Sequence, residues 1–72
     1  MNYLKSIGFA QRTYTGWHAK VVILNMEKIF NTFDEARKAQ REIAALCREN
    51  APELIGCRIE AYEGEFSCWY YI

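Results

Sequence analysis

The sequence has no net charge and no long apolar run. Nine Lys and Arg residues balance nine Asp and Glu residues over 72 positions. Proteins dedicated to binding nucleic acid usually carry a clear basic excess, so this balance counts against that class. No stretch approaches the roughly 20 apolar residues of a transmembrane helix, and no signal-peptide pattern opens the chain. We therefore expect a cytoplasmic protein that does not enter a membrane.

The residues that carry most enzyme chemistry are also scarce. The chain has one histidine, His18, and three cysteines, Cys47, Cys57 and Cys68. The cysteines are odd in number and widely spaced, unlike a disulfide framework or the close pairs of a zinc site. No spacing supports a Cys–His catalytic pair. We expect small buried thiols, and we predict no enzyme activity, no metal site and no cofactor.

What the chain does contain is apolar and aromatic. Hydrophobic residues make up 51% of the sequence and aromatic residues 15%. A chain of this size buries only about 60% of the surface that its unfolded form exposes, so its core must be efficient. We expect one domain that spans residues 1–72.

Three segments before the middle of the chain have the pattern of strands. They are residues 2–10, residues 17–24 and the short run 28–31, and polar turn residues separate them. One row of the second segment is apolar and consists of Trp17, Ala19, Val21 and Ile23. His18 and Lys20 lie in the opposite row, which would face away from the core.

A helix is predicted from Thr32 to Asn50. Thr32 can act as the N-cap and Glu35 follows three residues later, which is a capping box, and Pro52 follows the end of the helix. The residues expected to face the sheet are Ala36, Ala39, Ile43, Leu46 and Cys47. The charged residues on the other side are expected to be solvated, and Arg37, Lys38 and Arg41 form a modest basic stripe there that is an alternative contact surface.

The last twenty residues predict a hairpin. Glu63 and Gly64 would form a two-residue turn, which places Ala61 opposite Phe66 and Arg58 opposite Trp69. The row that would pack against the helix is Ile55, Cys57, Ile59, Ala61, Phe66, Cys68, Tyr70 and Ile72. Cys57 and Cys68 are diagonal in this register, so we predict no disulfide between them.

Together these elements predict an α+β fold. It is a small two-layer sandwich of order β-β-β-α-β-β, with a mainly antiparallel sheet and one helix packed on one face. The other face would stay open, and Trp, Tyr and Arg are the residue types enriched at binding hot spots. The candidate partner-binding residues on it are Arg58, Tyr62, Trp69, Tyr71, Lys20 and His18. The alternative is that these side chains only stabilise the sheet, with Arg58 stacked over Trp69.

The segments "GWHAKV" and "FNTFDEARKA" resemble domains of the AP2 type and the arm-binding domains of phage integrases. Those domains combine a three-stranded sheet with one helix and read DNA with the exposed sheet face. The resemblance implies that Arg12, His18, Lys20 and Val22 would face DNA. Val22 and the zero net charge depart from the Arg- and Lys-rich pattern of those families.

A second resemblance covers residues 16–72. "TFDEARKA" followed by "GCRIEAYEGEFSCWYYI" is similar to very small phage-encoded inhibitors, namely the T7-type inhibitor of host RNA polymerase and a compact type I anti-CRISPR protein. The resemblance implies a non-enzymatic protein that blocks a host protein or ribonucleoprotein complex sterically, in the host cytoplasm.

We therefore expect an inhibitor that binds its target through an aromatic sheet face. The alternative is a small nucleic-acid-binding module, in which the aromatic rings stack on bases while Lys20, Arg12 and Arg58 contact phosphates. A third interpretation is that the same face joins two copies of the chain in a homodimer.

Overall fold

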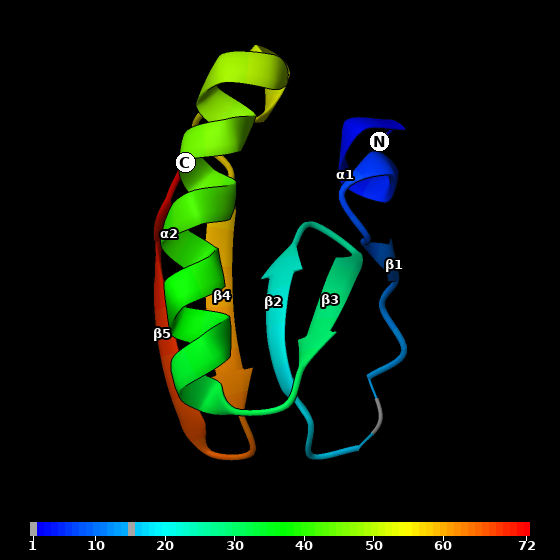
Figure 1. The fold of residues 1–72 in the computed structure, drawn as a ribbon, viewed down its shortest axis with the longest axis vertical. Helices are drawn as coiled ribbons and strands as arrows, with labels where there is room; N and C mark the ends of the chain where they lie inside the picture. The colour runs from blue at the N-terminus through cyan, green and yellow to red at the C-terminus, as the bar shows by residue number, and fades with distance from the viewer. Residues whose placement is uncertain (1, 15) are drawn as a thin grey trace.

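The computed structural model describes residues 2–14 and 16–72, which fold as two helices and five strands (Figure 1). The elements follow one another as α1 (Asn2–Ser6), β1 (Ala10–Gln11), β2 (Ala19–Ile23), β3 (Met26–Phe30), α2 (Phe33–Asn50), a 3-10 turn η1 (Pro52–Leu54), β4 (Arg58–Glu63) and β5 (Phe66–Tyr71). Among these residues no helix combines the length and the apolar character that crossing a membrane requires.

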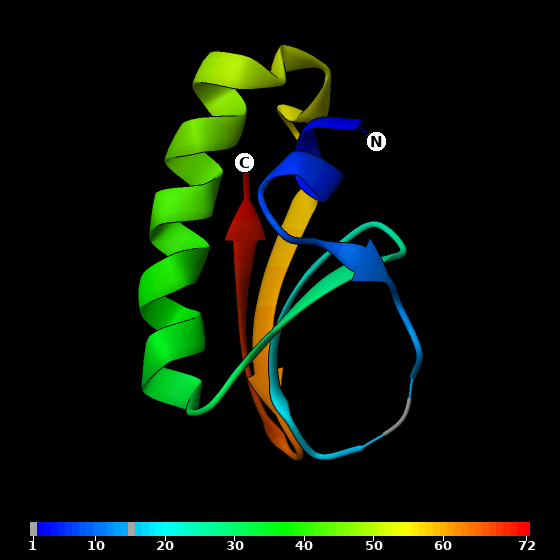
Figure 2. The same cartoon turned by 45° about the vertical axis from the view of Figure 1, so that its right-hand side comes forward.

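All pairs of neighbouring strands are antiparallel, in the order β1-β3-β2-β4-β5. Helix α2 runs along one face of the sheet and packs mainly on β4 and β2, as Figures 1 and 2 show. Val21, Ile23 and Ile59 point into the layer between them and are fully buried. The predicted α+β fold, with an antiparallel sheet and a long helix on one face, is confirmed.

The capping box predicted for α2 is present. The Thr32 hydroxyl accepts a hydrogen bond from the Glu35 amide at 3.2 Å, and the helix ends at Asn50. One position of its inward face was predicted wrongly, because Leu46 is exposed and the buried polar residue is Gln40. The Gln40 amide nitrogen donates to the carbonyl oxygens of Ile59 and Cys68, both at 2.9 Å. These hydrogen bonds tie the helix to both strands of the C-terminal hairpin.

The prediction of a first strand over residues 2–10 was wrong. Residues 2–6 form α1, and the strand is only the two residues of β1. Gly8 has a φ of 100° and its amide donates to the Lys5 carbonyl, while the Phe9 amide donates to the Leu4 carbonyl. This is a Schellman motif, in which the residue after the glycine contacts a residue of the last helical turn. Leu4 and Phe9 are both buried in the main core.

The turns of both hairpins lie at positions other than those predicted. In the first hairpin the turn is Leu24 and Asn25, so β3 begins two residues before the predicted start at 28. In the second, Gly64 and Glu65 form the turn, and Ala61 pairs with Cys68.

The physical reason for the second shift is the place of the glycine. Gly64 has a positive φ of 58°, and a type II′ turn takes glycine at its first central position. The register is therefore shifted by two residues, so Arg58 pairs with Tyr71 and not with Trp69. A shift of two leaves the strand side chains on their predicted faces. Two members of the predicted inner row are nevertheless exposed, namely Phe66 at the start of β5 (68%) and Ile55, which lies outside β4 (57%). The three cysteines are free thiols; Cys47 is buried as expected, whereas Cys57 and Cys68 are only partly buried.

Candidate functional site

A short segment covers half of the sheet face that α2 leaves bare. We call this segment, residues 12–14, the strap. It follows β1, and Figure 2 shows the chain there on the side of the sheet away from α2. The Arg12 amide donates to the Asn25 carbonyl at 2.9 Å, and the Thr13 side chain contacts Glu27 in β3. The outer face is therefore closed over Lys20, Val22 and Glu27, whereas Ile29 further along β3 stays 52% exposed.

A buried ion pair lies beneath the strap. Lys20 Nζ is 3.0 Å from Glu27 Oε1, and the two side chains are 1% and 4% exposed. The Thr13 amide and hydroxyl donate to the two oxygens of the same carboxylate, each at 3.3 Å. Burial alone would raise the pKa of Glu27, but the hydrogen bonds from Lys20 and Thr13 outweigh it and hold the pKa below its ordinary value of 4.5. Lys20 lies in the predicted outer row, yet the strap and this pair take its ammonium away from the open surface.

The other half of the outer face, over β4 and β5, carries what we call the open patch: Arg58, Trp69 and Tyr71. The Trp69 and Tyr71 side chains are 46% and 59% exposed. Their rings meet edge to face, with centroids 5.6 Å apart and an interplanar angle of 79°. The Arg58 guanidinium lies 4.3 Å from the centroid of the Trp69 ring. Each contact is of a favourable kind, so the three side chains hold one another in place while remaining accessible.

A carboxylate fixes the position of Arg58 from the other side. Arg58 Nη2 is 3.4 Å from Glu60 Oε2, and the Ser67 hydroxyl donates to the same oxygen at 3.0 Å. An exposed ion pair of this length contributes little to stability. Its effect is to orient the guanidinium over the indole.

Tyr62 and Arg12 mark the boundary between the covered half and the open half. Arg12 Nη2 donates to the Tyr62 hydroxyl at 3.4 Å. The Arg12 guanidinium also lies 4.4 Å from the centroid of the Tyr14 ring and 5.6 Å from that of Tyr62. Burial alone would lower the pKa of Arg12, but the interactions with Tyr62 and other neighbours raise it above its ordinary value. The guanidinium is therefore charged and held between two rings.

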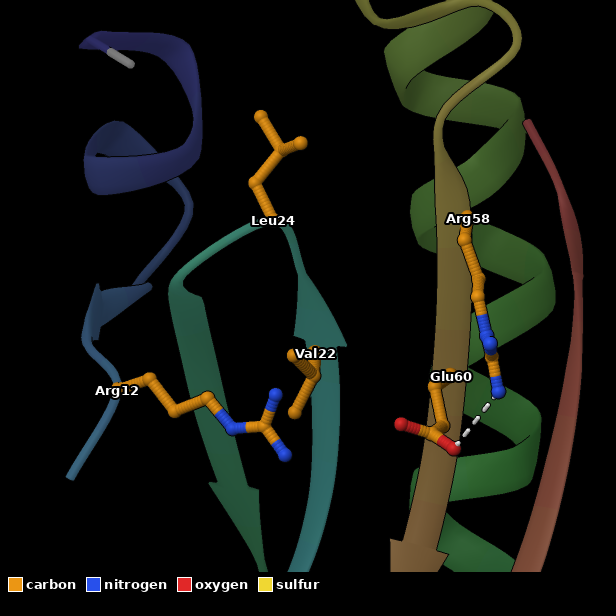
Figure 3. A pocket seen from close by; sticks show the side chains of 5 residues that line it. All are labelled: Arg12, Val22, Leu24, Arg58 and Glu60. Atoms are coloured by element: carbon orange, nitrogen blue, oxygen red, sulfur yellow. Dashed lines mark hydrogen bonds and ion pairs between the residues drawn. The ribbon is translucent and has the colours of Figure 1, made fainter. Parts of the chain in front are cut away.

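Between the strap and β4 the outer face is hollowed. The hollow has a volume of about 280 Å³ and is lined by Arg12, Val22, Leu24, Arg58 and Glu60. In Figure 3 Arg12 reaches across β3 towards Val22, whereas Arg58 and Glu60 stand on β4 at the opposite side. Val22 is buried and forms an apolar floor between the charged walls. We call this feature the arginine hollow.

His18 lies apart from the open patch. It precedes β2, beside Trp17, whose ring rests on the hairpin turn: a Cβ at Gly64 would come within 2.6 Å of that ring. Gly64 follows the last residue of β4, and Arg58 is the first. His18 is therefore at the opposite end of β4 from Arg58. Trp17 was predicted to face the core, but it lies outside β2 and is 76% exposed.

Of the six predicted site residues, the structure groups Arg58, Trp69 and Tyr71 and places Tyr62 at the border of that group. It buries Lys20 and separates His18. Arg12 was expected on this face only in the nucleic-acid-binding alternatives and was omitted from the predicted partner-binding set. A signal for it exists in "RTY", because an arginine two residues before a tyrosine can stack on that ring.

Over residues 2–14 and 16–72 no three His, Cys, Asp or Glu side chains are grouped so that they could hold a metal ion. No protein-family model, no curated protein and no solved structure matches the chain.

Proposed function

We propose that the chain is a non-enzymatic binding protein that docks on a larger protein or ribonucleoprotein complex through its open patch and blocks that surface. The observation that carries the proposal is the open patch itself. Two half-exposed aromatic rings and a stacked arginine occupy the part of the outer face that the strap leaves uncovered. The rings and the guanidinium already contact one another, so docking orders few freely rotating side chains. The small loss of side-chain entropy favours affinity.

The charges near the patch favour a protein surface over a phosphate backbone. Binding to nucleic acid depends mainly on cations that neutralise phosphates. Of the three basic residues expected to serve that purpose, Lys20 is buried in its ion pair and Arg58 contacts Glu60. A patch of Trp, Tyr and Arg with a neighbouring carboxylate has the composition of a protein-binding hot spot.

The similarity to phage-encoded inhibitors belongs to this proposal. An inhibitor of the anti-CRISPR or RNA polymerase type needs only a surface that excludes the normal ligand of its target, and 72 residues can present one. The proposed protein would act in the cytoplasm of the host cell, without cofactor or catalysis.

The test is affinity capture from bacterial lysate with the tagged chain, with and without nuclease. We expect a captured protein that survives nuclease. The variant Trp69→Ala/Tyr71→Ala should reduce its affinity at least about 30-fold, because hot-spot residues each contribute about 2 kcal/mol or more and add imperfectly. The control is Lys38→Ala/Arg41→Ala on the exposed side of α2, which should bind as the wild type does. Thermal unfolding shows that each variant is folded.

Three other results would support a different function or a different contact surface. Capture that disappears with nuclease and falls steeply with salt supports the nucleic-acid-binding module. Capture that the control pair abolishes assigns the contact to the basic stripe of α2. A dimer seen by light scattering that the double variant dissociates supports a homodimer.

A further inference from the structure

We infer that the arginine hollow receives a carboxylate of the protein partner, on an acidic residue that has an apolar neighbour. The inference rests on the proposed function, because it names the chemistry that the partner presents beside the open patch. It is carried by the position of Arg12 and by the excess of one positive charge among the residues that line the hollow.

Among the described residues Arg12 forms no ion pair, and the carboxylate of Glu60 acts on it only through space. The ion pairs found there are Lys20–Glu27 and Arg58–Glu60. The hydrogen bond of Arg12 to the Tyr62 hydroxyl is long, at 3.4 Å, and its buried Nε has no hydrogen-bond partner in residues 2–14 and 16–72. A guanidinium has five N–H donors, and its strongest pairing is the two-point hydrogen bond with a carboxylate or a phosphate. Arg12 therefore has donors to spare at the edge of the hollow.

The site is built before a ligand arrives. The Tyr14 and Tyr62 rings hold the Arg12 guanidinium, and Trp69 and Glu60 hold that of Arg58. Donors that are already oriented lose little entropy on binding. An anion in the hollow would thus meet two fixed cations.

The walls determine what kind of anion fits. Two arginines and one glutamate leave an excess of one positive charge, and Glu60 is already engaged by Arg58 and Ser67. One carboxylate balances that excess, whereas a phosphodiester chain brings a charge at every nucleotide next to Glu60. Val22 and Leu24 offer an apolar floor and rim, and the volume of about 280 Å³ holds more than a carboxylate. An acidic side chain with an apolar neighbour matches both features.

The first experiment needs no partner and uses benzoate as the probe. In ¹⁵N NMR titrations we expect benzoate to shift the Arg12 Nε–Hε signal and the amides of Val22 and Glu60, and benzamide to leave them in place. Arg12→Gln should weaken benzoate binding at least about tenfold, since a charged hydrogen-bonded pair is lost. Arg41→Gln removes the same charge from α2 and should change nothing. Arg58→Gln is an exposed second variant that keeps the strap intact and should also weaken binding.

Equal benzoate shifts in the wild type and both hollow variants would overturn the inference. Tighter binding of inorganic phosphate than of benzoate would overturn the carboxylate assignment in favour of nucleic acid. With the captured partner, Arg12→Gln should weaken binding at least about tenfold. If Trp69→Ala/Tyr71→Ala weakens binding of the captured partner and Arg12→Gln leaves it unchanged, this inference fails and the proposed function stands. If neither variant affects capture, the proposed function fails.

Discussion

Replacement of Lys20 by methionine is expected to lower the free energy of unfolding by about 3–5 kcal/mol, because it leaves a buried carboxylate without its cation. Glu27 is 4% exposed and would keep only the hydrogen bonds from Thr13. A chain of 72 residues has a total stability of about 4–11 kcal/mol. The expected loss is therefore a large part of the total, and in a urea titration followed by circular dichroism the midpoint of Lys20→Met should lie far below that of the wild type.

The matched control is the double variant Lys20→Met/Glu27→Leu. It removes both charges and leaves apolar side chains of similar length, which is often neutral for stability. We expect it to recover most of the loss of the single variant. If Lys20→Met is as stable as the wild type, the pair is not buried beneath the strap as described.

The same pair predicts a pH dependence. The pKa of Glu27 is lower in the folded protein than its ordinary value of 4.5. Its contribution is therefore fully present above pH 4.5 and is lost as the pH falls through the lower folded value. The urea midpoint of the wild type should fall more steeply in this acid range than that of Lys20→Met/Glu27→Leu. Parallel curves would contradict the stabilisation of ionised Glu27.

Replacement of Leu4 by alanine is the second large expected effect. Leu4 is 0% exposed and belongs to the same buried cluster as Cys47 and Leu54. A buried leucine replaced by alanine loses its transfer free energy and leaves a cavity, which together cost about 2–5 kcal/mol. The loss should appear in the urea midpoint with an unchanged slope.

The control for this change is Lys5→Ala, one residue further along α1. Lys5 is exposed, so its replacement should alter stability by less than about 0.5 kcal/mol. Equal effects at positions 4 and 5 would mean that α1 does not pack on the core. A large loss of stability at position 4 alone supports the packing of α1, which the sequence pattern did not predict, on the core.

The parts of the fold that could be predicted from the sequence are those with local signals. The capping box marks the start of α2, and the alternation in β4 and β5 assigns each side chain to a face. The prediction of a strand over residues 2–10 was wrong because the apolar residues there fit both the spacing of a strand and that of a helix. Tyr3, Ile7 and Phe9 alternate as in a strand, whereas Tyr3, Leu4 and Ile7 have helical spacing, and the glycine at position 8 decides for the helix.

The candidate site could be predicted only in part because it depends on contacts between residues far apart in the sequence. The face of Lys20 followed from alternation, but its burial depends on the strap, which meets β3 through the hydrogen bonds of Thr13 to Glu27. Those residues are fourteen positions apart along the chain, and no local pattern joins them. Arg12 acquires its place in the hollow from the same tertiary contact.

A partner is expected to bind to the outer face of β4 and β5. Photo-crosslinking in lysate tests this contact most directly, with p-benzoylphenylalanine placed at Tyr71 in one variant and at Lys38 in another. The aromatic replacement at Tyr71 keeps the character of the open patch, while Lys38 is exposed on α2. We predict a nuclease-resistant crosslink to one protein from position 71 and none from position 38. A crosslink from position 38 alone would contradict the claim and assign the contact to the helix.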